Sequence, residues 1–198
     1  MTRRHYVRIA IGVLLLALLA WGVNAGIERL VAPEPATGSA GAAGGPSAPE
    51  GVPRITATLY YASTDGQALV RVRREVPLAE GVVPQGRAIL AMQFQAAPAP
   101  YVSVIPEGTT LRAFYVTERG DAFVDISPDV STRHPGGSFT ELLTVYAIVN
   151  AVTANLPSIQ RVQILIDGKE ADTLAGHVDL RRPLQQDVTL VRDEPEAQ

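Results

Sequence analysis

The chain has 198 residues, of which 46% are hydrophobic and 19% are charged, and its formal net charge is −3. It contains no cysteine, which excludes a disulfide framework, a zinc–thiolate site, a thiol nucleophile and a lipid anchor on an N-terminal cysteine. The near-neutral charge argues against nucleic-acid binding, which requires a basic surface.

The N-terminal residues predict a membrane segment. Residues 1–8 hold three arginines and no acid, and residues 9–27 are apolar except for Asn24. As a helix this stretch measures about 28 Å, close to the thickness of a bilayer core. We favour a single-pass anchor, with residues 1–8 as its cytoplasmic basic flank. The alternative is a secretory signal peptide that is cleaved after Ala25.

Either interpretation places the remaining chain outside the cytoplasm, at the cell membrane or secreted from it. Without the three N-terminal arginines, this exported part has a net charge of −6. Residues 28–53 are dominated by Pro, Gly, Ala and Ser and cannot bury enough surface to form a core. We expect a flexible linker whose ends lie on the order of 25 Å apart.

The pattern changes at residue 54 and predicts one folded domain as far as residue 191. Alternating apolar residues indicate strands, and apolar residues spaced three and four apart indicate helices. In chain order, the expected elements are a hairpin over 55–61 and 69–76, a helix over 87–97 opened by Pro84, a hairpin over 111–117 and 122–126, a helix over 138–156, and a strand over 162–166.

The second helix has the clearest predicted boundaries. Ser138 and Glu141 fit a capping box, in which each side chain satisfies a backbone amide at the helix start, and Pro157 ends the helix. One or two short edge strands are expected over 178–191, followed by a frayed tail over 192–198. Together these elements predict an α+β fold: a mixed β-sheet with two helices packed on one face.

Several motifs of this domain stand in a recognisable order. They are Tyr60-Tyr61, Ile105-Pro106-x-Gly108-Thr109, Val124-Asp125-Ile126-Ser127, Tyr146-Ala147-Ile148-Val149-Asn150, Leu156-Pro157, Val162 to Gly168, and Gly176-His177-Val178-Asp179-Leu180. This set resembles the GerMN domain family of GerM-like sporulation and spore germination proteins, from Arg54 to about Val191. The resemblance implies an exported domain that mediates assembly or envelope interactions, with no known catalytic activity.

The resemblance also identifies signature residues, to which we assign structural roles. They are Pro106, Gly108, Tyr146, Asn150, Pro157, Gly168, Gly176, His177 and Asp179. The sequence departs from the family pattern at Ala151, where threonine is usual. It also has a single domain copy and no lipobox cysteine.

His177 and Asp179 are the residues that a search for a catalytic site would select. On a strand they face the same side, so they fit an acid–base pair or, with His134 and either Asp125 or Asp129, a metal fragment. We favour a histidine that fixes the turn by hydrogen bonding. The chain also lacks a Gly-x-Ser-x-Gly elbow and a phosphate loop, so we expect no catalytic residues, no cofactor and no metal.

Candidate contact residues lie in the first predicted hairpin. Arg71, Arg73 and Arg74 form a basic cluster on a half-exposed strand, and Tyr60 lies on the neighbouring strand. They are candidates for contact with a partner or with an anionic wall polymer.

The sequence therefore predicts a non-catalytic, membrane-tethered, extracytoplasmic interaction module for envelope or sporulation-like complexes. Its expected partners are the membrane, through Ile9 to Ile27, and envelope proteins. It is expected not to bind nucleic acid and to be monomeric or weakly self-associating. A cell-wall polysaccharide binder and an envelope hydrolase remain as alternatives.

Overall fold

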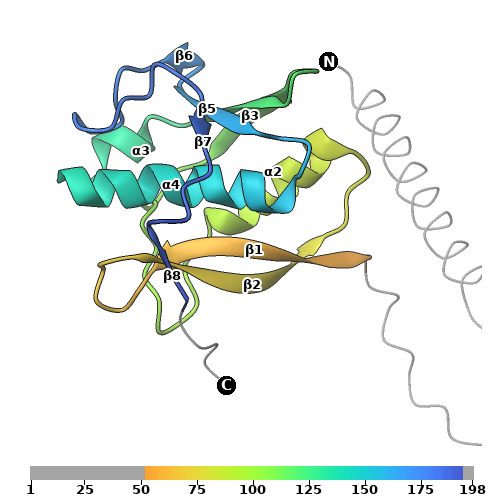
Figure 1. Cartoon of the computed structure of the whole chain (residues 1–198), viewed down its shortest axis with the longest axis horizontal. Helices are drawn as coiled ribbons and strands as arrows, with labels where there is room; N and C mark the ends of the chain where they lie inside the picture. The colour runs from red at the N-terminus through yellow and green to blue at the C-terminus, as the bar shows by residue number, and fades with distance from the viewer. Residues whose placement is uncertain (1–51, 194–198) are drawn as a thin grey trace, which may run out of the picture. The chain divides into compact units, whose positions relative to one another are not determined.

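The computed structural model describes residues 52–193 of the chain (Figure 1). The predicted basic flank, the membrane segment, nearly all of the linker and most of the predicted frayed tail lie outside these residues. Within residues 52–193, no helix is both long enough and apolar enough to cross a membrane.

The strands form two separate sheets. The first contains the antiparallel strands β1 (Arg54–Ala62) and β2 (Leu69–Pro77), with β8 (Val191–Arg192) parallel to β2. The second has the order β3 (Leu111–Val116), β4 (Asp121–Ile126), β5 (Arg161–Ile166) and β6 (Lys169–Glu170), and β7 (Leu184–Gln185) also pairs with β5. β4 and β5 are parallel. Both predicted hairpins are confirmed.

Two helices lie between the sheets, as Figure 1 shows: α2 (Val82–Gln93) and α4 (Ser138–Asn155). α4 contacts β1 of one sheet and β5 of the other. The α+β class with mixed strand directions is confirmed, but the expected single sheet with both helices on one face is wrong. The reason lies in α4, where ten of 18 residues are buried. A helix that is apolar around most of its circumference needs cover on more than one side.

The start of α4 also differs from the prediction. Gly137 is the N-cap residue and no side chain caps the helix, so the predicted capping box of Ser138 and Glu141 is wrong. Glu141 is fully buried, and its carboxylate accepts hydrogen bonds from the loop after β6 instead. The predicted end is correct, because Pro157 follows the last residues of the helix.

Two further elements refine the sequence prediction. α2 begins at Val82 and ends at Gln93, several residues before the predicted end at 97. A short helix, α3 (Asp129–Thr132), was not predicted.

The last described segment, residues 184–193, is here called the strap. It pairs with β5 through β7, crosses α4 and reaches the other sheet as β8 (Figure 1). Midway, the side-chain amide of Asn150 donates to the carbonyl oxygen of Asp187 at 2.8 Å and accepts from its N–H at 3.0 Å. The strap therefore connects the two sheets across the central helix.

Candidate functional site

The β1–β2 hairpin has two long edges, which differ in how many of their outward backbone groups are hydrogen-bonded. We call the side of β1 that faces away from β2 the β1 edge, and the side of β2 that faces away from β1 the β2 edge. In an antiparallel strand, alternate residues direct both backbone groups to the same edge. The backbone groups of Thr58, Tyr60 and Ala62 thus point to the β1 edge, and those of Arg71, Arg73 and Glu75 point to the β2 edge.

Side-chain amides from both helices close the β1 edge. Gln93 of α2 accepts from the N–H of Tyr60 at 2.9 Å and donates to its carbonyl oxygen at 2.6 Å. Asn155 of α4 accepts from the N–H of Thr58 at 2.8 Å and donates to its carbonyl oxygen at 2.7 Å. We call this arrangement an amide bracket. It is possible because a carboxamide carries a donor and an acceptor side by side, like a residue of a neighbouring strand.

A loop completes this edge. Ala62 and Val102 form an antiparallel bridge, with N–H to carbonyl oxygen distances of 2.9 and 3.2 Å. Thr58, Tyr60 and Ala62 therefore have partners for both backbone groups, so no second strand can add to this part of the β1 edge.

The β2 edge is paired only at its start. β8 lies opposite Leu69 and Val70, and the N–H of Leu69 donates to the carbonyl oxygen of Leu190 at 2.8 Å. Among residues 52–193, no strand lies beside β2 beyond Val70. The carbonyl oxygen of Glu75 accepts from the Arg54 guanidinium at 2.8 Å.

Three arginines line this edge from both faces. Arg71 and Arg73 are exposed on one face, and Arg71 forms an ion pair with Asp193, the residue after β8. Arg74 is half-buried on the opposite face, where its guanidinium contacts the Met92 sulfur at 3.7 Å. Burial raises the pKa of the Tyr61 hydroxyl, and the positive charge of Arg74 opposes that rise.

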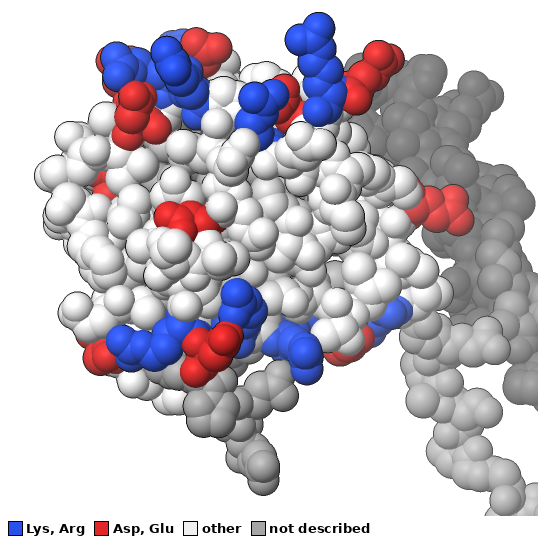
Figure 2. Space-filling model, in the orientation of Figure 1, with Lys and Arg blue, Asp and Glu red and all other residues white. Residues whose placement is uncertain are grey.

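The arginines border a hollow of about 400 Å³, lined by residues 71–74 together with Pro98, Ala99 and Tyr101. Figure 2 shows Lys and Arg atoms along the border that the β1–β2–β8 sheet occupies, with acidic atoms among them. The large face between this border and the opposite one is nearly uncharged in the same view.

Tyr60 does not belong to this surface, because it is 1% exposed. It packs into the core on the strongly covered strand β1, so its prediction as a contact residue is wrong.

A second, larger hollow of about 680 Å³ lies at the turn of the hairpin. It is lined by residues 62–66, by residues 102–107 and by parts of the α4 start, including Thr140 and Leu143.

The signature residues His177 and Asp179 lie in the loop between β6 and β7. Both oxygens of Glu141 are used there: Leu174, Ala175 and Val178 donate N–H groups to Oε1, and the N–H and Nδ1 of His177 lie 2.8 and 2.9 Å from Oε2. Burial raises the pKa of Glu141, but these hydrogen bonds outweigh it and the pKa is lowered. His177 therefore fixes this loop to α4, and its ring does so through the Glu141 side chain, whereas a backbone partner was expected.

Asp179 and His134 have structural partners of their own. Asp179 forms a forked ion pair with Arg181, which lowers its pKa. His134 accepts from the N–H of Gly136 at Nδ1 and lies 3.2 Å from the Thr144 hydroxyl at Nε2, and burial lowers its pKa. A search of residues 52–193 reveals no group of three His, Asp or Glu residues that is able to hold a metal ion.

The other signature residues hold turns and the strap. Gly108 has φ +87° in the turn closed by Thr109 N–H and the Pro106 carbonyl, and an added Cβ would lie 2.5 Å from the Arg133 guanidinium. The N–H of Gly168 donates to buried Asp125 at 2.7 Å. Gly176 has φ +104°, as its predicted role requires.

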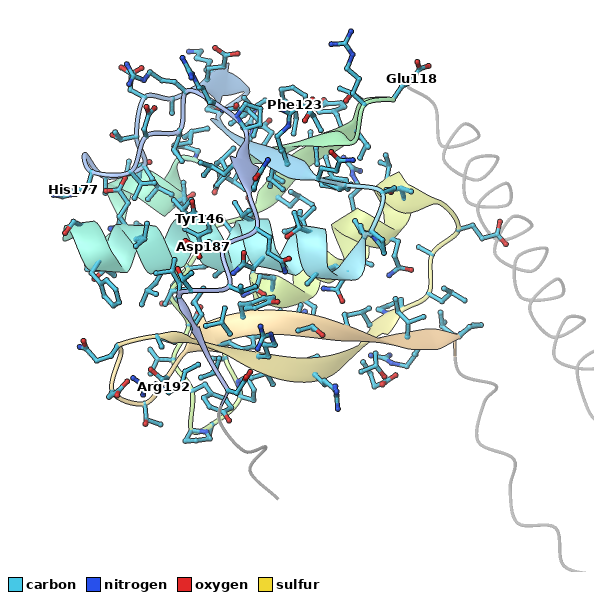
Figure 3. The ribbon with its side chains drawn as sticks, in the orientation of Figure 1. Glu118, Phe123, Tyr146, His177, Asp187 and Arg192 are labelled. Carbon is cyan, nitrogen blue, oxygen red and sulfur yellow. The ribbon has the colours of Figure 1, made fainter. Side chains whose placement is uncertain are left out.

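Tyr146 and Asn150 lie under the strap. Figure 3 shows Tyr146 beside Asp187, whose negative charge adds to burial in raising the tyrosine pKa. Asn150 brackets Asp187, so its predicted hydrogen bond to a neighbouring loop is confirmed. In the same view, His177 projects from the loop at one end of the domain, away from Arg192 on β8.

Sequence reasoning missed the brackets of Gln93 and Asn155. A signal was present, because each is an amide within a helix otherwise rich in apolar residues. A buried amide in such a helix must find partners.

Comparisons with known proteins agree with this architecture. Residues 58–172 match the family model described as "Germane: Sporulation and spore germination". The tandem GerMN domains of the sporulation protein GerM from Bacillus subtilis superpose with a TM-score of 0.51 at 18% identity, covering 68% of this chain and 46% of that one. The chain thus spans about half of that structure.

Two further solved structures are similar. A putative lipoprotein from Clostridium perfringens has 22% identity and a TM-score of 0.49, covering 67% of this chain and 87% of its own. The first GerMN domain of B. subtilis GerM has 19% identity and a TM-score of 0.49, covering 67% and 96%. No curated protein matches the chain.

Proposed function

Because the chain belongs to the Germane family of sporulation and spore germination domains, we propose that it is a membrane-tethered, extracytoplasmic interaction module of GerMN type without catalytic activity. The tether is the apolar segment 9–27 with the linker over 28–53. A short flexible linker keeps the domain concentrated near the membrane without fixing its orientation. This raises the effective concentration of the domain for envelope partners.

The observation that carries this proposal is the contrast between the hairpin edges. From Thr58 to Ala62 the β1 edge is closed by Gln93, Asn155 and Val102, whereas among the described residues the only strand on the β2 edge is β8, opposite Leu69 and Val70. Free strand edges readily pair with other chains, and recognition domains use them to bind extended segments.

Cross-linking in intact cells tests the interaction. The full chain, in the cells that produce it, should capture specific membrane or envelope proteins. A control that carries only residues 1–53 should not capture them. Recovery of the same proteins by both would contradict the proposal.

Two measurements test the tether. Protease added outside intact cells should cleave the domain, and protection of the domain would contradict an extracytoplasmic location. N-terminal sequencing of the mature protein distinguishes an uncleaved anchor from a signal peptide. A mature protein that starts at Gly26 would show that the segment is a cleaved signal peptide.

The absence of catalysis rests on the bonds of the candidate residues. His177, Asp179 and His134 each have a described partner that matches a structural role. In His177→Ala, we expect a less stable loop and no loss of any hydrolytic activity. A variant that keeps its fold while losing an activity of the wild-type chain would support the hydrolase alternative.

A wall-polymer binder is the second candidate, favoured by exposed Arg71 and Arg73 beside the hollow that Tyr101 lines. Retention of the full chain on purified wall material, lost when Arg71, Arg73 and Arg74 are all changed to Ser, would support it.

A further inference from the structure

We propose that His134 is a pH-sensitive latch: its neutral ring holds the loop before α4 in place beside the hollow of about 680 Å³, and its protonated ring releases that loop. The loop consists of residues 133–137, between α3 and α4. The latch needs neither a partner nor a catalytic step, so it is independent of the proposed function.

The hydrogen bonds of the His134 ring fix which nitrogen carries the proton. The N–H of Gly136 donates to Nδ1 at 3.0 Å, and a backbone N–H can only donate, so Nδ1 is the unprotonated nitrogen. The hydrogen of the neutral ring is therefore on Nε2, which lies 3.2 Å from the hydroxyl oxygen of Thr144. The structure thus contains the neutral ring, protonated at Nε2.

The hydroxyl of Thr144 extends this chain of bonds to a second segment. Its one hydrogen is directed to the carbonyl oxygen of Val104 at 2.6 Å or to that of Thr140 at 3.0 Å, so the hydroxyl oxygen is left to accept from Nε2. Thr144 is fully buried, which shields these bonds from water. A continuous chain of hydrogen bonds therefore connects the Gly136 amide to the Val104 carbonyl.

The two ends of this chain of bonds lie in two segments that line the hollow. Pro135, next to the bonded amide of Gly136, lines it from the loop, and residues 102–107, including Val104, line it from the segment before β3. The loop enters α4 through Gly136 and Gly137, both with positive φ. Glycine changes its backbone conformation at little cost, so the loop is able to move once the bond is lost.

Protonation of the His134 ring is incompatible with this arrangement. The second proton would be on Nδ1 and would face the N–H of Gly136, so two donors would meet where one hydrogen bond existed. The contact becomes repulsive, and either the ring or the loop must move. The bond at Nε2 is kept, because Nε2 remains a donor. Acid therefore breaks the latch at Gly136 and not at Thr144.

The other histidine of the described residues, His177, responds in the opposite way. Its Nδ1 lies 2.9 Å from Oε2 of Glu141. A carboxylate can only accept, so this nitrogen already carries a proton. Protonation of His177 adds its proton at Nε2 and leaves the bond to Glu141 in place. Within residues 52–193, His134 is thus the histidine that loses a hydrogen bond on protonation.

The surroundings of His134 keep its ring neutral near pH 7. Burial lowers the pKa of the ring and is the largest influence, Glu141 of α4 raises the pKa, and His177 of the β6–β7 loop lowers it. The result is a pKa below the usual 6.5. The stability that the latch provides is therefore complete above pH 6.5, and it is lost as the pH falls from there through the folded pKa.

The charged residues of the neighbouring segments have other positions or partners. Asp129 and Arg133 of α3 and its C-cap both lie near Gly108, at 3.8 and 2.5 Å from an added Cβ. In the segments that line the hollow, Asp65 is held in an ion pair and Glu107 is exposed. The response to acid is therefore assigned to the His134 ring.

NMR of the full chain in detergent micelles tests the state of the ring. Near pH 7.5, the ¹⁵N shifts of the imidazole nitrogens should show His134 protonated at Nε2 and His177 protonated at Nδ1. Between pH 7.5 and pH 5, the His134 ring should titrate with a midpoint below 6.5. His134 protonated at Nδ1 near pH 7.5, a midpoint above 6.5, or no titration above pH 5 would overturn the proposal.

Hydrogen exchange measures the bond itself. The protection factor of the Gly136 amide is the exchange rate of an unstructured peptide at the same pH divided by that of this amide. It should fall at least fivefold between pH 7.5 and pH 5, with the midpoint of the His134 ring. The Gly120 amide, which donates to the Thr117 carbonyl at 3.1 Å, is the control and should change less than twofold. An unchanged Gly136 amide would overturn the latch.

A variant that cannot titrate separates His134 from other acid-sensitive groups. In His134→Asn, the side-chain oxygen accepts from the N–H two residues further on, which is the Asx turn that the histidine ring imitates. Protection of the Gly136 amide should then be the same at pH 7.5 and pH 5. A fall as large as that of wild type would show that another group controls the loop, and the proposal would fail.

His177→Gln is the matched variant at the other histidine. It leaves His134 and its bonds in place, so the Gly136 amide should still lose protection at least fivefold in acid. Glu141 does not interfere, because its contribution is lost mainly below pH 4.5. If the response disappears in His177→Gln and persists in His134→Asn, the switch belongs to His177 and the proposal is overturned.

Spin labels measure the movement of the loop. The chain has no cysteine, so Glu107→Cys with Pro135→Cys provides two unique labelling sites at exposed positions that both line the hollow. The distribution of distances between the labels should at least double in width from pH 7.5 to pH 5, and it should not change when His134→Asn is added. Equal distributions at both pH values without His134→Asn would overturn the release of the loop.

Discussion

The two edges of the β1–β2 hairpin differ in how their outward backbone groups are protected from pairing with other chains. On the β1 edge, Thr58 and Tyr60 bond to side-chain amides on two helices. On the β2 edge, β8 covers the start of the strand, and the exposed side chains of Arg71 and Arg73 place charge beside the backbone groups that follow. An unpaired edge is a liability that proteins manage by covering it or by charging it. Covering excludes every partner, whereas charge still admits a partner of the opposite sign.

The largest effect is expected from opening the β1 edge at Tyr60. Gln93→Leu keeps the size of the side chain but leaves the buried N–H and carbonyl of Tyr60 without partners. The free energy of unfolding should fall by about 2–5 kcal/mol, because each unsatisfied buried group costs about 1–3 kcal/mol. Denaturant titration measures it. Gln95→Leu, at an exposed position, is the control and should change stability by less than about 0.5 kcal/mol.

Asn155→Leu should open the same edge at Thr58 with a smaller loss, about 1–2 kcal/mol, because this bracket is partly exposed and water replaces some of its bonds. The same denaturant titration applies. The Asn155→Asp variant keeps the acceptor and loses the donor, so its stability should lie between those of wild type and Asn155→Leu. A loss equal to that of Gln93→Leu would contradict the role of burial in the difference between the brackets.

A third prediction concerns the pH dependence of stability, which should come from titrating groups such as Glu141 and not from the amide brackets. Carboxamides do not titrate, so acid should not open the β1 edge directly. Glu141 does titrate, and its folded pKa is lowered from 4.5. Its contribution to stability is therefore complete above pH 4.5 and is lost as the pH falls through the folded pKa.

Unfolding titrations between pH 7 and pH 2 should show this decline, and it should be shallower in Glu141→Gln. We expect the change to be smaller than the loss of a bracket, since a protonated carboxyl group still accepts hydrogen bonds. An identical acid slope in wild type and variant would contradict the assignment.

The smallest effect on stability is expected at the β2 edge. Arg71→Ser with Arg73→Ser should change the free energy of unfolding by less than about 0.5 kcal/mol, as is usual for surface substitutions. A loss comparable to that of Gln93→Leu would show that the arginines support the fold, and the contrast between the edges would disappear.

Local patterns were sufficient for most elements of this domain. Alternation in residues 55–61 and 69–76 and the apolar spacing of 138–156 predicted the first hairpin and the central helix, because burial on one or more faces leaves a periodic trace. The position of α4 between two sheets was missed. Its nearly continuous apolar surface indicated burial, but not how many layers provide it.

The site was predicted in part. The contact role of the arginine cluster stays a prediction, and Tyr60 was included in it wrongly because alternation does not reveal that both faces of β1 are covered. Glu141 matched the spacing of a capping box and instead bonds residues 33 to 37 positions away. Gln93 and Asn155 reach β1 over 33 and 97 positions. Such pairings depend on tertiary placement and leave no local pattern.

The strap also has a consequence for the order of events during synthesis. β2 is complete at residue 77, but its partner β8 spans residues 191–192. At about 5–20 residues per second, the first sheet waits on the order of ten seconds for its third strand. During that interval the whole β2 edge, including Leu69 and Val70, is exposed. A folding helper therefore has its widest access to the hairpin before the chain is finished, and β8 then covers the edge at Leu69 and Val70.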